Sequence, residues 1–352
     1  MKTANKRIGF RIFIFLYLGL FLTTIGGGIA PFLPVTFLSF IQLIPAAFPL
    51  LFVLHLLFLM YFMRKSLRWG VLTTTGLAIC VWGLSKDVRF KQASPEKQTE
   101  DVLRIVSFNV GTFDYDPKII DQSASLINEL NPDIVTLQEF RNHRLDDGSL
   151  AMDYVAQALG MDHYEFVHLP VHIHGAATYS KFPILDLDTL FMPQKEINSG
   201  ILSTIQTPIG KIGVANLHLS SFHVAQTLDQ NKGLKNRSRA MYLNTSEVLK
   251  LQQEKVDLTL NKVKLYPHPL ILTGDLNAPS HSRITVQFAD YFQDSFQAAG
   301  NGSGWTFPIL GPVGMRIDYQ FSSEELEVVR HEVIRSAVSD HYPVLVEYTL
   351  NP

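Results

Sequence analysis

The feature that most constrains this chain is a run of 52 residues, between Arg11 and Arg64, that contains no Asp, Glu, Lys or Arg. A second uncharged run extends from Trp69 to Ser85. A helix that crosses a bilayer needs roughly 20 apolar residues, so the first run is long enough for two spans and the second for one. The first run is broken by Gly26-Gly27-Gly28, Pro31 and Pro34. We therefore predict three membrane-spanning helices, near Ile12–Ala30, Phe40–Met63 and Trp69–Ser85.

A cleaved signal peptide in front of a hydrophobic core is the alternative interpretation of this region. It would require a short apolar stretch and a small-residue cleavage site, followed by polar mature sequence. Here the apolar residues continue instead. The only cysteine, Cys80, lies inside the third predicted span, so the rest of the chain can form no internal disulfide.

The distribution of basic residues predicts an orientation for these spans. Lys2, Lys6, Arg7 and Arg11 precede the first span, the connection between the first two spans has no Lys or Arg, and Arg64, Lys65 and Arg68 precede the third. Because basic residues favour the cytoplasmic side, this order is inside, outside, inside. We expect an integral protein of the cell (inner) membrane, with everything after Lys86 extracytoplasmic.

Charge differs strongly between the two parts of the chain. Residues 1–100 hold 11 Lys and Arg against 3 Asp and Glu, a net of +8, whereas residues 101–352 hold 19 against 29, a net of −10. The basic end suits a membrane anchor beside anionic lipid. The acidic part argues against a protein that grips nucleic acid through its phosphates, because that function favours a basic face.

The pattern after the third span predicts a linker at 86–100 and a layered α/β domain over 101–352, with residues 1–85 as the anchor. Runs rich in β-branched residues alternate with helical spacing. The predicted strands cover 102–110, 133–138, 201–206, 212–217, 269–273, 317–321, 326–331 and 344–350, and the predicted helices cover 117–130 and about 238–263.

Polar side chains are concentrated where the predicted strands end, at Asn109, Glu139, His218, Asp275, Asn277, Asp318, Asp340 and His341. Strand ends of a rigid sheet can bring residues from distant parts of a sequence together. Hard cations such as Mg²⁺ prefer carboxylate and amide oxygens, and histidines paired with carboxylates suit proton transfer near neutral pH. Each of these residues alone is typical of a solvated strand end or a turn. Their occurrence together indicates a site.

Seven stretches of the chain resemble the endonuclease/exonuclease/phosphatase superfamily, which includes deoxyribonucleases, apurinic endonucleases, neutral sphingomyelinases and inositol polyphosphate 5-phosphatases. The stretches are RIVSFNV (104–110), PDIVTLQE (132–139), ATYSKFPI (177–184), ANLHL (215–219), LTGDLNAP (272–279), RIDY (316–319) and SDHYPV (339–344). The departures are mild. Leu276 stands where an aromatic residue is frequent, and Tyr179 stands where an aliphatic one is.

The resemblance implies a four-layer α/β/β/α sandwich of two mixed sheets, here preceded by an all-helical transmembrane region. It implies that Asn109 and Glu139 bind a metal ion, Mg²⁺ with Mn²⁺ as the alternative, and that Asp340 lies near it. It further implies that His218 contacts the phosphate and that Asp275 and Asn277 position the attacking water. His341 would be the catalytic histidine and Asp318 its orienting carboxylate. Whether Asp275 or the His341–Asp318 dyad takes the proton stays open.

Three other groups of residues are weaker candidates. His172 and His174 would share one face of a strand and could bind a metal, although a histidine pair of this kind is more often at the surface. Arg237 and Arg239 could reach a substrate phosphate from the start of the long helix, or could simply be solvated. Trp305, in a glycine-rich loop, could touch substrate or pack beneath that loop.

Two classes of function remain open at this point. The chain is expected to be a Mg²⁺-dependent phosphoric ester hydrolase, since none of the implied catalytic residues is missing; an inactive relative used for binding is the alternative. For an outward-facing domain, a lipid headgroup or another phosphodiester near the bilayer is the favoured substrate, ahead of extracellular nucleic acid and soluble phosphomonoesters.

Overall fold

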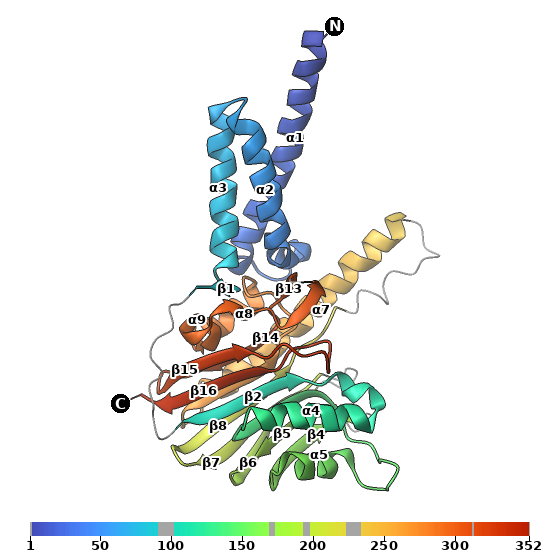
Figure 1. Cartoon of the computed structure of the whole chain (residues 1–352), viewed down its shortest axis with the longest axis vertical. Coiled ribbons are helices and arrows are strands. Elements are labelled where there is room, and N and C mark those ends of the chain that lie inside the picture. Colours follow the sequence, from blue (N-terminus) through green and yellow to red (C-terminus); the bar gives the residue numbers. More distant parts are fainter. Residues whose placement is uncertain are drawn as a thin grey trace.

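The computed structural model describes residues 2–90, 102–168, 173–192, 198–222, 234–311 and 313–351. Three long helices come first, at one end of the molecule: α1 (Lys2–Ile29), α2 (Phe48–Met63) and α3 (Leu67–Leu84) (Figure 1). The 3₁₀ helices η1 (Ala30–Phe32) and η2 (Ser39–Ala47) connect α1 to α2. Three segments, Gly9–Phe32, Ser39–Met63 and Leu67–Leu84, are long and apolar enough to cross a membrane. The prediction of three apolar helices is confirmed.

The break between the first two helices lies at the prolines and not at the glycines. Helix α1 runs through Gly26-Gly27-Gly28 and ends at Ile29. A Cβ on Gly27 would lie 2.7 Å from Ile44 Cγ2 and 3.0 Å from Phe48 Cε1, so this glycine allows η2 and α2 to approach α1 closely. Pro31 then lies within η1, because proline fits the first turn of a helix but not its interior.

The rest of the chain forms two six-stranded sheets. The first has the order β15-β16-β2-β3-β5-β4 and the second β10-β14-β9-β8-β7-β6. Both have the same pattern, since β2–β3 and β8–β9 are parallel and all other neighbours within these sheets are antiparallel. The strands of the first sheet are β2 (Leu103–Asn109), β3 (Ile134–Arg141), β4 (His163–His168), β5 (His174–Ser180), β15 (Leu326–Val333) and β16 (Val344–Leu350). Those of the second are β6 (Ile184–Phe191), β7 (Gly200–Thr207), β8 (Gly210–His218), β9 (Leu270–Asp275), β10 (Gln293–Asp294) and β14 (Asp318–Ser322).

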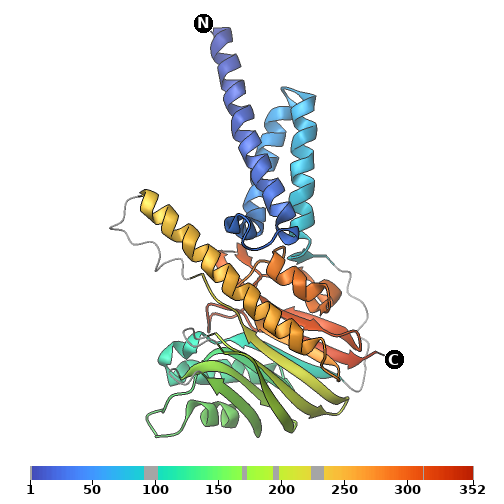
Figure 2. The ribbon, with the colours of Figure 1, turned by 180° about the vertical axis from the view of Figure 1, so that it is seen from behind.

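Helices cover the outer faces of the two sheets. After the 3₁₀ helix η3 (Gly111–Tyr115), α4 (Pro117–Glu129) and α5 (Ala151–Leu159) pack on the first sheet. On the second sheet, α7 (Leu234–Val263) and α8 (Arg283–Ala289) form the cover. Figures 1 and 2 show the two covers on opposite sides. A third apolar cluster, which includes Ile105, Val214 and Val346, fills the space between the sheets. The predicted four-layer sandwich of two mixed sheets is therefore confirmed.

The helical bundle rests directly on the sandwich. Gln42 Oε1 in η2 accepts a hydrogen bond from the Arg283 backbone N at 2.9 Å, and His281 Nε2 lies 3.2 Å from the Gly28 carbonyl oxygen. After α3, the short strand β1 (Val88–Arg89) pairs with β11 (Gly302–Ser303). The α1–α2 connection is thus fixed to the sandwich at the start of α8. The end of α3 is fixed beside the short helix α9 (Ser295–Ala299), where Gln297 Nε2 donates to the Lys86 carbonyl. A small hairpin of β12 (Phe307–Leu310) and β13 (Val313–Met315) follows β11.

Candidate active site

Alternation along the strands directs the polar side chains of the site toward the space between the sheets. In β9, Leu270 and Leu272 belong to the cluster under α7 and α8, whereas Ile271 faces the first sheet. Because successive side chains of a strand point to opposite faces, Asp275 shares the inward face with Ile271. The same alternation puts His218 on the inward face of β8 together with Val214, and Asn109 on the inward face of β2 together with Ile105. Polar strand ends from both sheets therefore meet between the layers.

Glu139 reaches this space through a β-bulge. Val135 and Leu137 face the outer cluster under α4 and α5, so regular alternation would also turn Glu139 outward. The pairing of β3 with β5 shifts register between Leu137 and Phe140, and Glu139 has a φ of +53°. A bulge of this kind redirects a side chain. Phe140 accordingly packs in the outer cluster, and the Glu139 carboxylate lies beside Asn109.

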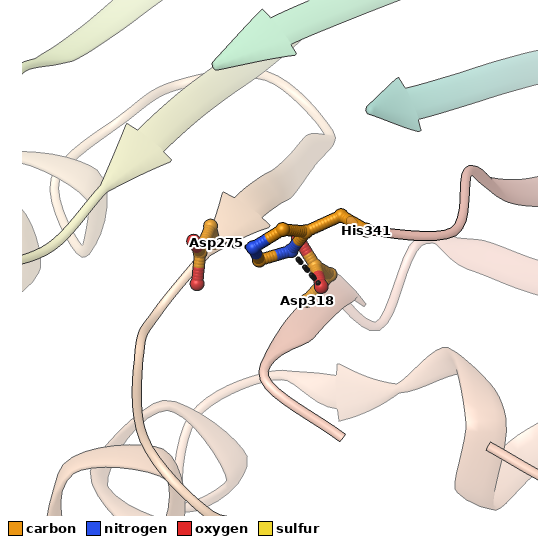
Figure 3. Close-up of side chains that lie close together, drawn as sticks. All are labelled: Asp275, Asp318 and His341. Atoms are coloured by element: carbon orange, nitrogen blue, oxygen red, sulfur yellow. Dashed lines mark hydrogen bonds and ion pairs between the residues drawn. The ribbon is translucent and has the colours of Figure 1, made fainter. Parts of the chain in front are cut away.

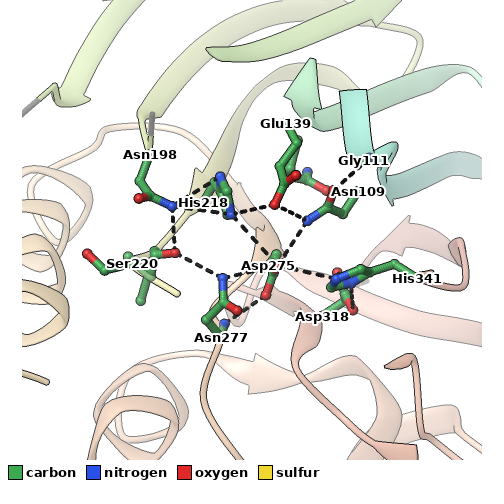
Figure 4. A network of polar contacts seen from close by, with 12 residues as sticks. Asn109, Gly111, Glu139, Asn198, His218, Ser220, Asp275, Asn277, Asp318 and His341 are labelled. Carbon is green, nitrogen blue, oxygen red and sulfur yellow. Dashed lines mark hydrogen bonds and ion pairs between the residues drawn. The ribbon is translucent and has the colours of Figure 1, made fainter. Parts of the chain in front are cut away.

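Asp275 is held in place by hydrogen bonds to both carboxylate oxygens (Figure 4). Asn109 Nδ2 donates to Oδ2 at 3.0 Å and Asn277 Nδ2 donates to the same atom at 3.1 Å. The Asn277 backbone N donates to Oδ1 at 2.7 Å. Gly274, next to Asp275, has a φ of +131°, and a Cβ on it would lie 1.9 Å from the Leu217 carbonyl oxygen. A glycine is required there for β8 and β9 to lie this close.

His218 stands between Asp275 and Glu139. Its Nε2 lies 3.4 Å from Glu139 Oε1 and 3.8 Å from Asp275 Oδ2. Asn198 Nδ2 lies 3.2 Å from the ring nitrogens and donates to the Leu219 carbonyl at 2.8 Å. Burial lowers the pKa of His218 to about 4, although the Glu139 carboxylate opposes this shift. The ring is therefore neutral at pH 7 and keeps one nitrogen as an acceptor.

His341 and Asp318 form a hydrogen-bonded pair next to Asp275 (Figure 3). His341 Nδ1 lies 2.9 Å from Asp318 Oδ2, and His341 Nε2 lies 3.8 Å from Asp275 Oδ2. Burial alone would lower the pKa of His341, but the carboxylates of Asp318 and Asp275 outweigh it and raise the pKa. Burial, with the nearby Asp318, raises the pKa of Asp275. The two groups are therefore suited to hold and exchange a proton.

The side chains of this cluster fit a cation that prefers oxygen ligands. Glu139 and Asp275 present carboxylate oxygens on either side of Asn109, whose Nδ2 donates to Glu139 Oε1 at 3.3 Å and to Asp275 Oδ2 at 3.0 Å. The Asn109 Oδ1 accepts from the Gly111 backbone N at 3.1 Å, and carboxylate and amide oxygens are the ligands that Mg²⁺ and Mn²⁺ prefer. Asp275, Asp318 and His341 form an overlapping set, in which one possible ligand atom from each lies within 4.8 Å of the others. In that second set the imidazole Nδ1 is already engaged by Asp318. The donors of the first set are better suited to a hard cation.

The structure brings seven of the eight predicted site residues into this one network. The eighth, Asp340, is exposed, and its Oδ1 lies 3.3 Å from Ser339 Oγ, which in turn lies 2.9 Å from the Asn109 carbonyl oxygen. Trp305 is half-buried. His174 begins β5 opposite Arg141, while its predicted partner, His172, lies outside the described residues. Arg237 and Arg239 are in α7, but their side chains also lie outside the described part.

Asn198, Lys255, Thr306 and Phe307 support the site and were not predicted from the sequence. Asn198 contacts His218, and Lys255 Nζ in α7 donates to Ser220 Oγ at 2.6 Å. Thr306 Oγ1 accepts hydrogen bonds from the backbone N of Ile317 and Asp318, at 3.2 and 3.1 Å. The Phe307 ring packs on the His341 ring with centroids 5.0 Å apart. A polar residue in a loop or on a polar helix carries no periodic signal that could have revealed these contacts.

Residues 106–341 match the Endonuclease/Exonuclease/phosphatase family. No curated protein matches the chain. Among solved structures, an endonuclease/exonuclease/phosphatase from Beutenbergia cavernae is similar with a TM-score of 0.53 at 21% identity, over 71% of this chain and 72% of that one. One from Bacteroides vulgatus gives a TM-score of 0.53 at 17% identity, over 72% of this chain and 100% of that one. A family protein from Bacteroides thetaiotaomicron gives 0.50 at 20% identity, over 72% and 99%. At these identities, the similarity to the three structures shows a shared fold of the sandwich.

Proposed function

The chain belongs to the endonuclease/exonuclease/phosphatase family, and we propose that it is a membrane-tethered, metal-dependent hydrolase of phosphodiester bonds. The observation that carries this proposal is the convergence of strand ends from both sheets. Asn109 and Glu139 come from the first sheet, and His218 and Asp275 come from the second, and all four are joined by contacts of 3.0–3.8 Å. Their chemistry is that of hard-metal binding combined with proton transfer.

In this proposal Glu139 and Asn109 hold a Mg²⁺ or Mn²⁺ ion, with Asp340 near it. Such an ion, when bound, stabilises negative charge on the phosphoryl and leaving oxygens. The neutral ring of His218 offers a hydrogen bond to a phosphoryl oxygen. The Asn277 Nδ2 donates hydrogen bonds to Asp275 Oδ2 and to the Leu219 carbonyl oxygen, and these bonds hold the Asp275 carboxylate in one orientation.

The reaction is an in-line attack of water on phosphorus. The water oxygen forms a bond to phosphorus, the ester oxygen opposite it leaves, and the water proton passes to a base of the enzyme. In this proposal either Asp275 or the His341–Asp318 dyad takes that proton, and the two lie side by side, with His341 Nε2 3.8 Å from Asp275 Oδ2. Hydrolysis of a diester then leaves a phosphomonoester and an alcohol.

The anchor belongs to the same proposal. Residues 1–85 would hold the protein in the cell (inner) membrane, residues 86–100 would link, and residues 101–352 would carry the catalysis on the extracytoplasmic side. The distribution of basic residues around the three apolar helices supports this orientation. Two alternatives are an extracytoplasmic nuclease and an inactive binding module of the same fold.

A metal-dependence assay on the full-length chain in detergent tests the proposal. Bis(p-nitrophenyl) phosphate, a soluble diester, should be hydrolysed with Mg²⁺ or Mn²⁺ and not in excess EDTA. Glu139→Gln should lower turnover by about a hundredfold or more and weaken Mn²⁺ binding, which electron paramagnetic resonance measures directly. Full activity in excess chelator would refute the metal site. An absence of diester hydrolysis, with Mn²⁺ still bound, would instead indicate a binding module.

A further inference from the structure

An uncharged segment of the sandwich lies on the side that faces the helical bundle. Between Asp294 and Arg316 there are 21 residues without Asp, Glu, Lys or Arg, in a part of the chain that otherwise holds 29 acidic and 19 basic residues. This segment includes the β12–β13 hairpin. Its tip is apolar and exposed: Ile309 is 57% exposed, Leu310 78% and Val313 37%. Apolar side chains grouped at one tip in this way mark a contact surface.

The hairpin lies beside the lower end of the bundle in both views of the molecule (Figures 1 and 2). On that side, the connection between α1 and α2 also exposes apolar rings, with Phe32 71% and Phe37 54% exposed. The strand before the hairpin, β11, pairs with β1 just after α3, and Arg316, just after the hairpin, donates to the Lys86 carbonyl, so the base of the hairpin is held close to the end of α3. If the three helices span a bilayer, the hairpin tip meets the surface of that bilayer.

The base of the hairpin is attached to the catalytic dyad. Thr306, just before β12, accepts the backbone N–H of Asp318 through its hydroxyl and the backbone N–H of Tyr342 through its carbonyl, at 3.1 and 2.7 Å. Phe307 packs on the His341 ring. From Phe307 to Leu310 there are three residue steps, which span at most about 10 Å in a strand. The separation of 5.0 Å between the Phe307 and His341 ring centroids and the reach of the Phe307 side chain add to this length, so the dyad lies within roughly 20 Å of the hairpin tip.

From this arrangement we infer that the β12–β13 hairpin contacts the bilayer and that the site acts on the phosphodiester group of a membrane lipid. The inference rests on the proposed function, since it requires both the hydrolase and the anchor. The bilayer is the partner because the apolar tip continues the apolar surface of the bundle and because no charge of the segment opposes contact with anionic lipid. The headgroup phosphate enters beside His341 while the acyl chains remain in the membrane.

A charge placed at the tip separates lipid hydrolysis from diester hydrolysis. The full-length protein is reconstituted in vesicles of phosphatidylcholine, phosphatidylethanolamine and phosphatidylglycerol, and conversion of phosphodiester to phosphomonoester is followed by phosphorus NMR. Leu310→Glu should lower lipid turnover by about tenfold, the effect of losing one buried leucine from an interface. The same variant should keep its turnover of bis(p-nitrophenyl) phosphate. Leu265→Glu is the matched control, since Leu265 is 85% exposed and follows α7 at the end of that helix remote from the bundle.

Each outcome of this experiment identifies which statement fails. Equal lipid turnover in Leu310→Glu and the unchanged protein would refute the hairpin contact. Hydrolysis of the soluble diester without hydrolysis of any vesicle lipid would refute the lipid substrate and leave the proposed function standing. If neither substrate is hydrolysed, the proposed function itself fails, and the lipid inference fails with it. Loss of lipid turnover in both Leu310→Glu and Leu265→Glu would show a general effect of added charge and would also overturn the inference.

Discussion

Asp275 is the residue on which the contacts of the site converge, and it illustrates how burial creates reactivity here. It is 1% exposed, it accepts hydrogen bonds from Asn109 and Asn277, and it lies 3.8 Å from a nitrogen of each site histidine. A carboxylate that is buried beside another carboxylate holds its proton more tightly than one in water. The two histidines shift in opposite directions around it: the pKa of His218 falls and that of His341 rises.

The His341–Asp318 pair should act as a single catalytic unit. His341→Ala is expected to lower turnover by at least about a hundredfold, the usual contribution of a positioned acid or base. Asp318→Asn should also cause a large loss, because the carboxylate fixes the imidazole tautomer and offsets its charge. The double variant should be little worse than His341→Ala alone, since residues that act together are not additive. Turnover of a soluble diester by all three variants provides the measurement.

Thermal unfolding of the same three variants is the control for this prediction. The Thr306–Tyr342 backbone hydrogen bond does not depend on the side chain at position 341 and still supports that loop, so a cooperative transition should remain. If His341→Ala retains near-normal turnover, the dyad has no catalytic role. If that variant does not fold, His341 is a structural histidine.

Several of these residues could be found from the sequence because each follows a strand with a recognisable pattern. Alternation correctly turns Asp275 and His218 inward, since their strands are regular up to the last residue. Alternation alone would wrongly turn Glu139 outward, because a β-bulge, in which Glu139 has a φ of +53°, redirects its side chain toward the space between the sheets. Asn198 could not be found, because it lies in the connection before β7 and its role depends on the position of His218 across two strands.

At the scale of elements, prolines and glycines of the bundle have separate roles that the sequence does not distinguish. Both types of residue occur near position 30, and either could end a helix. In the structure the glycines lie inside α1 against Ile44 and Phe48, and the helix ends only at Ile29. Strand β1 was likewise not predicted, because its two residues pair only with the distant β11. Contacts between segments far apart in the chain leave no local pattern.

The element boundary before β14 contains a buried ion pair with a testable effect on stability. Arg316 is 1% exposed, forms a bidentate salt bridge with Asp294, and donates to the Lys86 carbonyl just after α3. Arg316→Met should lower the free energy of unfolding by about 3–5 kcal/mol, because Asp294 would remain buried without its partner. The double variant Arg316→Met with Asp294→Asn should recover part of this loss, since it leaves no unpaired charge at position 294 and the amide oxygen can still accept the backbone N–H of Phe296 at the start of α9.

Chemical denaturation of the full-length protein in detergent measures these differences. The exposed pair of Lys262 and Asp188, whose side chains are 42% and 53% exposed, serves as the comparison. Lys262→Met should change the unfolding free energy by less than about 1 kcal/mol, because solvent screens a surface pair. An equally small effect for Arg316→Met would contradict the view that this pair fixes the end of α3 to the sandwich.

At the scale of the whole molecule, the anchor and the sandwich form one continuous structure. A hydrogen bond from Arg283 fixes the α1–α2 connection to the sandwich. A hydrogen bond from Gln297 and the β1–β11 pairing fix the segment just after α3. If the three apolar helices span a membrane, the site is held on whichever side the last helix reaches. Under the proposed function, the orientation of α3 therefore decides which phosphodiesters the site can meet.

The basic residues predict that orientation, and a fusion tests it. Arg64, Lys65 and Arg68 lie between α2 and α3, and the connection between α1 and α2 has no Lys or Arg. Basic loops stay in the cytoplasm, so α3 should carry the chain outward. Alkaline phosphatase, which is active only outside the cytoplasm, should therefore be active when fused after Glu100. Green fluorescent protein at the same position should be dark.

Replacing the three basic residues with Gln, while adding Lys residues between Pro34 and Ser39, should reduce or reverse both signals. A cytoplasmic signal from the unchanged anchor would overturn the extracytoplasmic assignment and would make intracellular nucleic acid an accessible substrate.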